Sequence, residues 1–112
     1  MGKIVEVKTE AELAEALKTA TGPVVLDFVD MEGCSYCQEE SPRIEKLVAS
    51  CRNVTVIRAD VTNPEIDKLA NDWKVDALPT LYVASTPSEL RPGVAREVEN
   101  ARAAMAFLKC KR

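Results

Sequence analysis

Histidine is missing from this sequence, and its absence excludes two common kinds of site. A thiol protease pairs its cysteine with a histidine, and imidazole is the commonest ligand of transition metals in proteins. Four cysteines are present, which are too few and too unevenly spaced for a scaffold stapled by disulfides. A tetrahedral zinc site would need all four, including Cys51 and Cys110 from other helical segments. We therefore expect no metal ion and no other bound cofactor.

Strong charge of either sign is lacking as well. The chain has 15 Lys and Arg against 18 Asp and Glu, a net charge of −3, without a block of like charges. Neither nucleic acid nor an anionic membrane is therefore an expected partner. No apolar run approaches the roughly 18 residues of a membrane span, and Glu6 and Lys8 interrupt any signal-peptide core. We expect a soluble, cytoplasmic monomer in which residues 1–112 form a single domain.

The apolar residues predict an alternation of strands and helices. The segment 24–29 is apolar at nearly every position, as in a central strand covered on both faces. Strands are expected at 4–7, 24–29, 54–59, 81–83 and 94–98. Helices are expected at 9–20, from the cysteine pair at 34–37 to residue 51, and at 63–73. A last helix is expected to begin at residue 100 and to end in the cationic segment 109–112. This order predicts an α/β fold with a mixed five-stranded sheet flanked by four helices.

The segment Cys34-Ser35-Tyr36-Cys37 lies between the central strand and the following helix. Two thiols separated by two residues in the first turn of a helix can bond to each other reversibly. The unpaired N–H groups and the positive end of the helix dipole stabilise a thiolate there, lowering a cysteine pKa from about 8.5 to roughly 3.5–7.5. Cys34 is the expected nucleophile and Cys37 the resolving thiol. An inert structural pair is the alternative.

Asp27 is a carboxylic acid inside the apolar central strand. Desolvation penalises its charged form, so its pKa is expected to be raised. An acid poised near neutrality can take the proton from Cys37 when that thiol attacks a mixed disulfide. The alternative is a buried acid with a structural role alone.

Several landmarks together resemble the thioredoxin family along nearly the whole chain. They are Leu26-Asp27-Phe28, the Cys34 to Cys37 segment, Pro42, Asp60 with Asn63-Pro64, and Trp73-Lys74-Val75-Asp76-Ala77-Leu78-Pro79-Thr80. A lone C-x-x-C is a weak signal. A proline far downstream, just before a strand and followed by threonine, makes the combination a strong one.

The resemblance implies the thioredoxin fold and assigns roles to residues around the cysteines. Asp27 matches the buried acid of the family. Pro79 matches a cis-proline that lies against the active-site disulfide. Leu78 and Thr80 would then flank the groove that holds an extended substrate.

The sequence departs from the family pattern on either side of the buried acid. One additional residue separates Asp27 from Cys34, which predicts either a bulge or a displaced Asp27. Val56 stands where many thioredoxins have a buried lysine, which removes one partner for the acid. The hairpin between the last two strands is also longer than the tight glycine turn of the family.

The residues next to the cysteines differ from the family as well. Gly33 replaces the usual tryptophan, so the edge of the substrate groove is expected to be more open. Ser35 and Tyr36 replace Gly-Pro, and we expect both to line the groove, although Tyr36 could instead be a surface aromatic. Without proline, the N–H of Tyr36 is expected to point at the Cys34 sulfur. This predicts a less reducing protein than a Gly-Pro thioredoxin, whose potential is about −270 mV.

These residues predict a thiol–disulfide oxidoreductase acting as a general protein disulfide reductase. Its expected partners are disulfide-containing proteins and a thioredoxin reductase or an equivalent electron donor. An oxidase or isomerase of an extracytoplasmic compartment would use the same residues, and a non-catalytic binding module would use the groove at Pro79 without turnover. An iron–sulfur cluster bridged between two chains, as in some glutaredoxins with this dipeptide, is a further alternative, although no Gly-Gly motif follows the final hairpin to hold glutathione.

Three other residues are interpreted from their positions. Cys51 lies on an apolar helical stripe and is expected to be a small core residue. Cys110 is expected to be an exposed thiol, with a link between two chains as the alternative. Trp73 is expected in the core.

Overall fold

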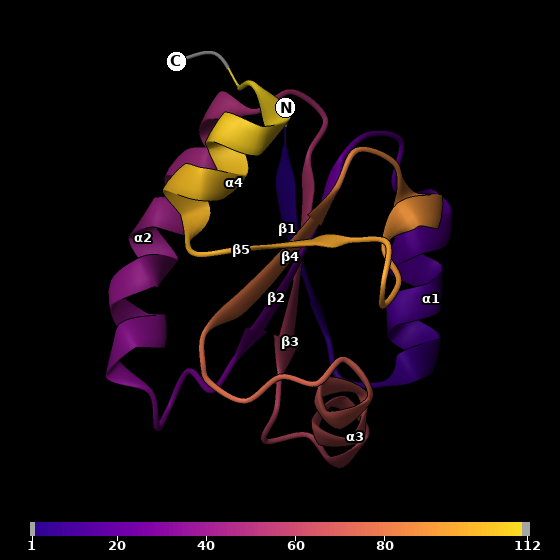
Figure 1. Cartoon of the computed structure of the whole chain (residues 1–112), viewed down its shortest axis with the longest axis vertical. Coiled ribbons are helices and arrows are strands. Elements are labelled where there is room, and N and C mark those ends of the chain that lie inside the picture. The colour runs from indigo at the N-terminus through magenta and orange to yellow at the C-terminus, as the bar shows by residue number, and fades with distance from the viewer. Residues whose placement is uncertain (1, 111–112) are drawn as a thin grey trace.

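The computed structural model describes residues 2–110, which form one five-stranded sheet between two pairs of helices (Figure 1). The elements in chain order are β1 (Lys3–Val7), α1 (Glu10–Thr19), β2 (Val24–Val29), α2 (Ser35–Ser50), β3 (Thr55–Asp60), α3 (Pro64–Asp72), β4 (Thr80–Ala84), the 3-10 helix η1 (Pro87–Glu89), β5 (Arg96–Val98) and α4 (Ala101–Leu108). The predicted α/β class, with a mixed sheet and four α-helices, is confirmed.

The strands lie in the order β1-β3-β2-β4-β5. β3 runs parallel to both β1 and β2, and β4 runs antiparallel to β2 and β5. β2 is therefore the middle strand, and all six of its residues are buried. This burial explains why its sequence is apolar at five positions and why its one acid, Asp27, is exceptional.

The two faces of the sheet are covered by different helices. α1 and α3 pack on one face, where their buried side chains join Phe28 and Trp73 in one apolar cluster. α2 and α4 pack on the other face, around Ile44, Leu47 and Ala104. Figure 1 shows the two pairs on opposite sides of the sheet, with the C-terminal ends of α2 and α4 at the same edge. The predicted core position of Trp73 is confirmed.

Helix starts follow from local sequence. The Thr9 hydroxyl accepts a hydrogen bond from the Glu12 amide at 3.1 Å, which begins α1 as predicted. Asn63 begins α3, but its side chain donates to the Asp60 carbonyl instead of capping the helix. The Asn100 side chain accepts from the Ala103 amide and begins α4.

The C-terminal third differs in detail from the sequence prediction. The loop after β4 contains η1 and buries Leu90 in the apolar cluster on the α1 side. The amides of Val94 and Ala95 donate to the Arg91 carbonyl in a turn, so β5 is shorter than the predicted strand at 94–98. α4 ends at Leu108, and Lys109 adopts a left-handed conformation. The rest of the predicted cationic end, Lys111 and Arg112, lies outside the described residues. Within residues 2–110, the helices are too short or too polar to cross a bilayer.

Candidate active site

The two cysteines of the motif lie at the start of α2 and are joined by a disulfide. Cys34 is the N-cap residue and is half-buried, whereas Cys37 lies in the first turn with 2% of its surface exposed. Their Cα atoms are 5.2 Å apart, well inside the usual range for a disulfide. An incoming thiol or disulfide can therefore reach the sulfur of Cys34 but not that of Cys37.

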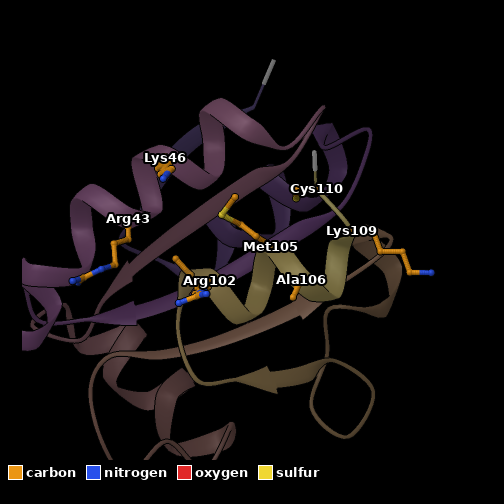
Figure 2. Close-up of a pocket in the computed structure, with 8 residues that line it drawn as sticks. Arg43, Lys46, Arg102, Met105, Ala106, Lys109 and Cys110 are labelled. Carbon is orange, nitrogen blue, oxygen red and sulfur yellow. The ribbon is translucent and has the colours of Figure 1, made fainter. Parts of the chain in front are cut away.

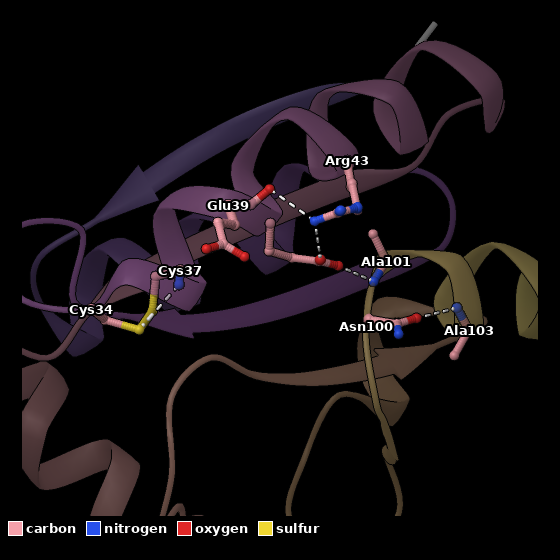
Figure 3. Close-up of polar contacts among 8 residues, drawn as sticks. Cys34, Cys37, Glu39, Arg43, Asn100, Ala101 and Ala103 are labelled. Atoms are coloured by element: carbon pink, nitrogen blue, oxygen red, sulfur yellow. Dashed lines mark hydrogen bonds and ion pairs between the residues drawn. A yellow bond between two sulfur atoms is a disulfide. The ribbon is translucent and has the colours of Figure 1, made fainter.

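The amide that donates to the Cys34 sulfur is that of Cys37, at 3.1 Å (Figure 3). The sequence predicted that the Tyr36 amide would do this, and that prediction is wrong for the described residues. An N-cap side chain can accept from the amide two or three residues ahead of it, and the Cys34 sulfur accepts from the amide three residues ahead. The hydrogen bond and the positive end of α2 both favour negative charge on Cys34 once the disulfide opens.

The segment before β4 lies against the disulfide. The Leu78–Pro79 peptide bond is cis, as the resemblance implied. The carbonyl oxygen of Leu78 lies 3.6 Å from the Cys34 sulfur. Thr80 is buried, and its hydroxyl donates to the Ala77 carbonyl. These contacts place the backbone of Leu78 and Pro79 beside the reacting sulfur.

A turn before α2 accommodates the additional residue between Asp27 and Cys34. The Asp30 carboxylate accepts hydrogen bonds from the amides of Glu32 at 3.2 Å and Gly33 at 2.9 Å. The backbone carbonyl of Asp30 accepts a hydrogen bond from the Cys34 amide. Pairing of β2 with β3 continues without interruption to the end of β2, so the predicted bulge is absent from this strand. The additional residue lies after β2 and does not shift Asp27 along the strand.

The same turn places the Asp30 side chain against Gly33, so a larger residue at this position would require that side chain to move. A Cβ atom on Gly33 would lie 2.7 Å from an Asp30 carboxylate oxygen, closer than such atoms approach each other. Gly33 itself is exposed, and the nearby Tyr36 side chain is 71% exposed. Tyr36 is thus the large aromatic side chain available beside Cys34.

Asp27 is only 2% exposed, and its environment favours the neutral acid. Burial raises the pKa of Asp27 to about 6 from its ordinary 3.8, the Arg58 charge opposes this rise, and the Glu40 charge adds to it. One carboxylate oxygen, Oδ1, has no hydrogen-bond partner among the described residues. The predicted upward shift is confirmed.

Arg58 is a partner of Asp27 that sequence reasoning missed. Its Nε lies 3.7 Å from Asp27 Oδ2, an ion pair too long for a hydrogen bond, and its Nη2 donates to the Ser41 hydroxyl at 3.4 Å. Val56, at the position of the family's buried lysine, predicts that the acid lacks this basic partner, and Arg58 supplies another. Arg58 faces Asp27 directly across the β2 and β3 pairing, and strand register was the signal that could have shown it.

Glu40 connects the active-site helix to α4. One of its oxygens accepts from the Ala101 amide at the start of α4, and the other forms an ion pair with Arg43 at 3.4 Å. Its negative charge contributes to the high pKa of Asp27. Glu40 therefore holds α4 in place while acting on the buried acid.

Replacing Asp27 by asparagine is expected to stabilise the oxidised protein above pH 6. The folded state binds the Asp27 proton more tightly than the unfolded chain, so the free energy of unfolding falls as pH rises from about 4 to about 6. At pH 7 the ionised Asp27 therefore lowers the free energy of unfolding by up to about 3 kcal/mol, a loss that the uncharged asparagine avoids. Urea unfolding at pH 3.5 and pH 7 measures the difference, which should appear only at the higher pH.

Asp60 provides a matched control for this prediction. Partial burial raises its pKa, but hydrogen bonds from Thr62 and the Met31 amide outweigh that effect and leave the pKa below its ordinary value. Its contribution to stability is therefore present above pH 4 and is lost in acid, so Asp60→Asn should be destabilising at pH 7. A gain for Asp27→Asn that is equal at both pH values would contradict the assignment.

The remaining two cysteines form a second disulfide. Cys51, the C-cap of α2, is buried, and it is bonded to Cys110 with a Cα separation of 4.9 Å. The predicted free thiol at Cys110 is therefore wrong, although the core position of Cys51 is confirmed. The two residues meet because α2 and α4 end at the same edge of the molecule. Within residues 2–110, no three cysteine or carboxylate side chains gather as metal ligands would.

The fold and the site together define a thiol–disulfide oxidoreductase. A mixed sheet, a Cys34–Cys37 disulfide at the start of a helix, and a cis-proline segment beside it are all present. The thioredoxin family model matches residues 4–109, and the chain belongs to the thioredoxin family.

Known relatives and structures agree with this assignment. The chain is 30% identical over 79 residues to Thioredoxin H2-1 of Oryza sativa subsp. japonica, a match covering 70% of this chain and 55% of that protein. It is 28% identical over 91 residues to a thioredoxin of Chlamydia trachomatis, covering 81% of this chain and 84% of that protein. Oxidised thioredoxin O1 from Arabidopsis thaliana has a TM-score of 0.74 at 25% identity, covering 94% of this chain and 96% of that chain. The chain thus spans little more than half of the rice relative and most of the bacterial one.

Proposed function

We propose that this protein is a general reductase of protein disulfides. The observation that carries the proposal is the half-buried Cys34 sulfur at the N-cap of α2, hydrogen-bonded by the Cys37 amide. In the dithiol form, the Cys34 thiolate attacks one sulfur of a substrate disulfide, and the other substrate sulfur leaves as a thiolate. Cys37 then attacks Cys34, which releases the reduced substrate and restores the 34–37 disulfide.

Asp27 supplies the proton acceptor for the second attack. Its pKa of about 6 leaves it mostly ionised at neutral pH yet basic enough to take a proton from the buried Cys37 thiol, directly or through water. Arg58 keeps that pKa from rising further. The step is therefore expected to accelerate as pH rises through about 6.

The substrate backbone lies along the segment Leu78-Pro79-Thr80. The Leu78 carbonyl lies beside the Cys34 sulfur and precedes the cis bond to Pro79, a position from which it can accept a hydrogen bond from the backbone of an extended substrate. Gly33, Ser35 and Tyr36 are exposed close to Cys34 in the sequence and would contact the other side of the bound substrate. An open edge at Gly33 suits a reductase that accepts many proteins.

The electrons come from a thioredoxin reductase or an equivalent donor, because the chain holds only the two electrons of its dithiol. The proposal includes a monomer in the cytoplasm, where the glutathione and thioredoxin systems keep thiols reduced. The match to the thioredoxin family model and the 28% identity to a bacterial thioredoxin support this choice of direction.

The potential of the 34–37 pair tests the direction. We expect a value above the roughly −270 mV of a Gly-Pro thioredoxin, because the Tyr36 amide, although it does not donate to the Cys34 sulfur, adds to the positive end of α2 an N–H dipole that proline lacks. Equilibration of a Cys51→Ser/Cys110→Ser variant with glutathione buffers measures this pair alone. Turnover with NADPH and a thioredoxin reductase then tests whether the dithiol is regenerated.

Two outcomes would contradict the reductase proposal. A potential near the −120 mV of a strong oxidant, without turnover by the reductase, would favour an oxidase or isomerase. Failure to accelerate insulin reduction in dithiothreitol would favour a non-catalytic binding module.

A further inference from the structure

The Cys51–Cys110 disulfide lies at the opposite end of α2 from the active site and is accessible to solvent on one side. Cys51 is 4% exposed, whereas Cys110 is half-buried and lines two separate hollows. Nothing in the proposed mechanism uses these sulfurs. A disulfide with one buried and one accessible sulfur has the same asymmetry as the Cys34–Cys37 pair.

A cationic groove leads to Cys110. The groove has a volume of about 570 Å³ and runs between α2 and α4. Figure 2 shows Arg43 and Lys46 extending from α2, and Arg102 and Met105 from α4. Its lining contains four cations and no acid, in a chain whose net charge is −3. This concentration of positive charge selects for an anionic occupant.

We propose that Cys51–Cys110 is a second thiol–disulfide exchange site, whose reductant is an anionic low-molecular-weight thiol of the glutathione class bound in this groove. The groove volume is in the range of small-molecule sites. Carboxylates of the thiol pair with Lys46 and Arg102, two of the three lining cations that form no ion pair within the described residues, Lys109 being the third. The thiol is thereby brought to Cys110, which is half-buried and lines the groove.

The exchange has two steps. The ligand thiolate attacks the Cys110 sulfur, the 51–110 bond breaks, and the sulfur of Cys51 leaves as a thiolate that takes up a proton. A second ligand thiolate attacks the mixed disulfide on Cys110, which releases the oxidised ligand as its own disulfide and leaves Cys110 as a thiolate. Two thiols are thus oxidised to one disulfide while the protein disulfide is reduced to two thiols.

The test isolates the second pair in the full chain. In a Cys34→Ser/Cys37→Ser background, the rate of reduction is measured with glutathione, neutral 2-mercaptoethanol and cationic cysteamine, each corrected for its thiolate concentration. We expect glutathione to react about tenfold faster than the neutral thiol at low salt, and cysteamine to be slowest. The preference should decline as salt increases.

Charge variants then connect the preference to the groove. Lys46→Gln/Arg102→Gln is expected to abolish the advantage of glutathione without changing the rate with 2-mercaptoethanol. Lys18→Gln/Lys68→Gln removes two exposed charges from α1 and α3 and should leave the advantage intact. Equal rates for all three thiols, or the same loss in both charge variants, would overturn the proposal. The proposal would also be overturned if none of the three thiols reduced the Cys51–Cys110 disulfide in the folded protein.

The site of attack is tested separately. In a Cys34→Ser/Cys37→Ser/Cys51→Ser variant, oxidised glutathione should form a mixed disulfide on Cys110, which peptide mass mapping detects. In the matching variant that keeps Cys51 and carries Cys110→Ser, modification of the buried thiol should be at least about tenfold slower. Equal modification of the two cysteines would contradict Cys110 as the attacked sulfur.

Discussion

Replacing Cys34 by serine is expected to abolish disulfide reduction, with a loss of at least about a thousandfold in rate. The thiolate is the nucleophile of the reaction, and a serine hydroxyl stays protonated at neutral pH even at the N-terminus of a helix. The structure leaves no substitute nearby, because Cys37 is buried and the other two cysteines lie at the far end of α2. Insulin reduction in dithiothreitol measures the loss.

Cys37→Ser separates the two chemical steps. This variant keeps the attacking sulfur, so it should form a mixed disulfide with substrate and fail to release it. A Cys110→Ser variant serves as the control and should retain insulin reduction, since its sulfur takes no part in the first site. If Cys34→Ser reduced insulin as fast as the control, the mechanism would be wrong.

Removing the second disulfide is expected to lower stability by about 2–4 kcal/mol. Cys51 and Cys110 are separated by 59 residues, and closing a loop of that length removes much of the conformational freedom of the unfolded chain. The double variant Cys51→Ser/Cys110→Ser avoids leaving a single reactive thiol. Urea unfolding of the variant and the oxidised parent, both with the 34–37 pair oxidised, measures the difference.

The expected change has a distinct signature. The disulfide acts mainly by restricting the unfolded chain. The variant should therefore unfold at a lower urea concentration and show a larger m-value, the slope of the unfolding free energy against urea concentration. A Cys51→Ala/Cys110→Ala variant controls for burying the serine hydroxyl at position 51. Unchanged stability in both variants would show that the bond is not closed in the protein in solution.

Local patterns in the sequence were sufficient for most of the fold. The uninterrupted apolar strand, the Thr9 cap and the helical stripes each depend on residues that are neighbours in the chain. The Cys34–Cys37 disulfide could be predicted for the same reason, since four consecutive residues define it. The cis bond at Pro79 came from resemblance and not from any physical property of the sequence.

The features that were missed depend on contacts between distant segments. The Cys51–Cys110 bond requires knowing that α4 packs on α2 with both helices ending at one edge. The Arg58 partner of Asp27 requires the register of two strands. No propensity or spacing rule carries that information for a single sequence, so both could be found only in the folded chain.

Helix α2 has a cysteine pair at each end, and its 16 residues correspond to a length of about 24 Å. Sulfur exchange requires direct contact between sulfur atoms, so electrons cannot pass from one pair to the other inside a single molecule. Any equilibration between them needs a collision of two protein molecules or a diffusing carrier thiol. The two pairs can therefore hold different oxidation states at the same time. Within one chain, the oxidation state of each pair depends only on the thiols and disulfides that reach that pair.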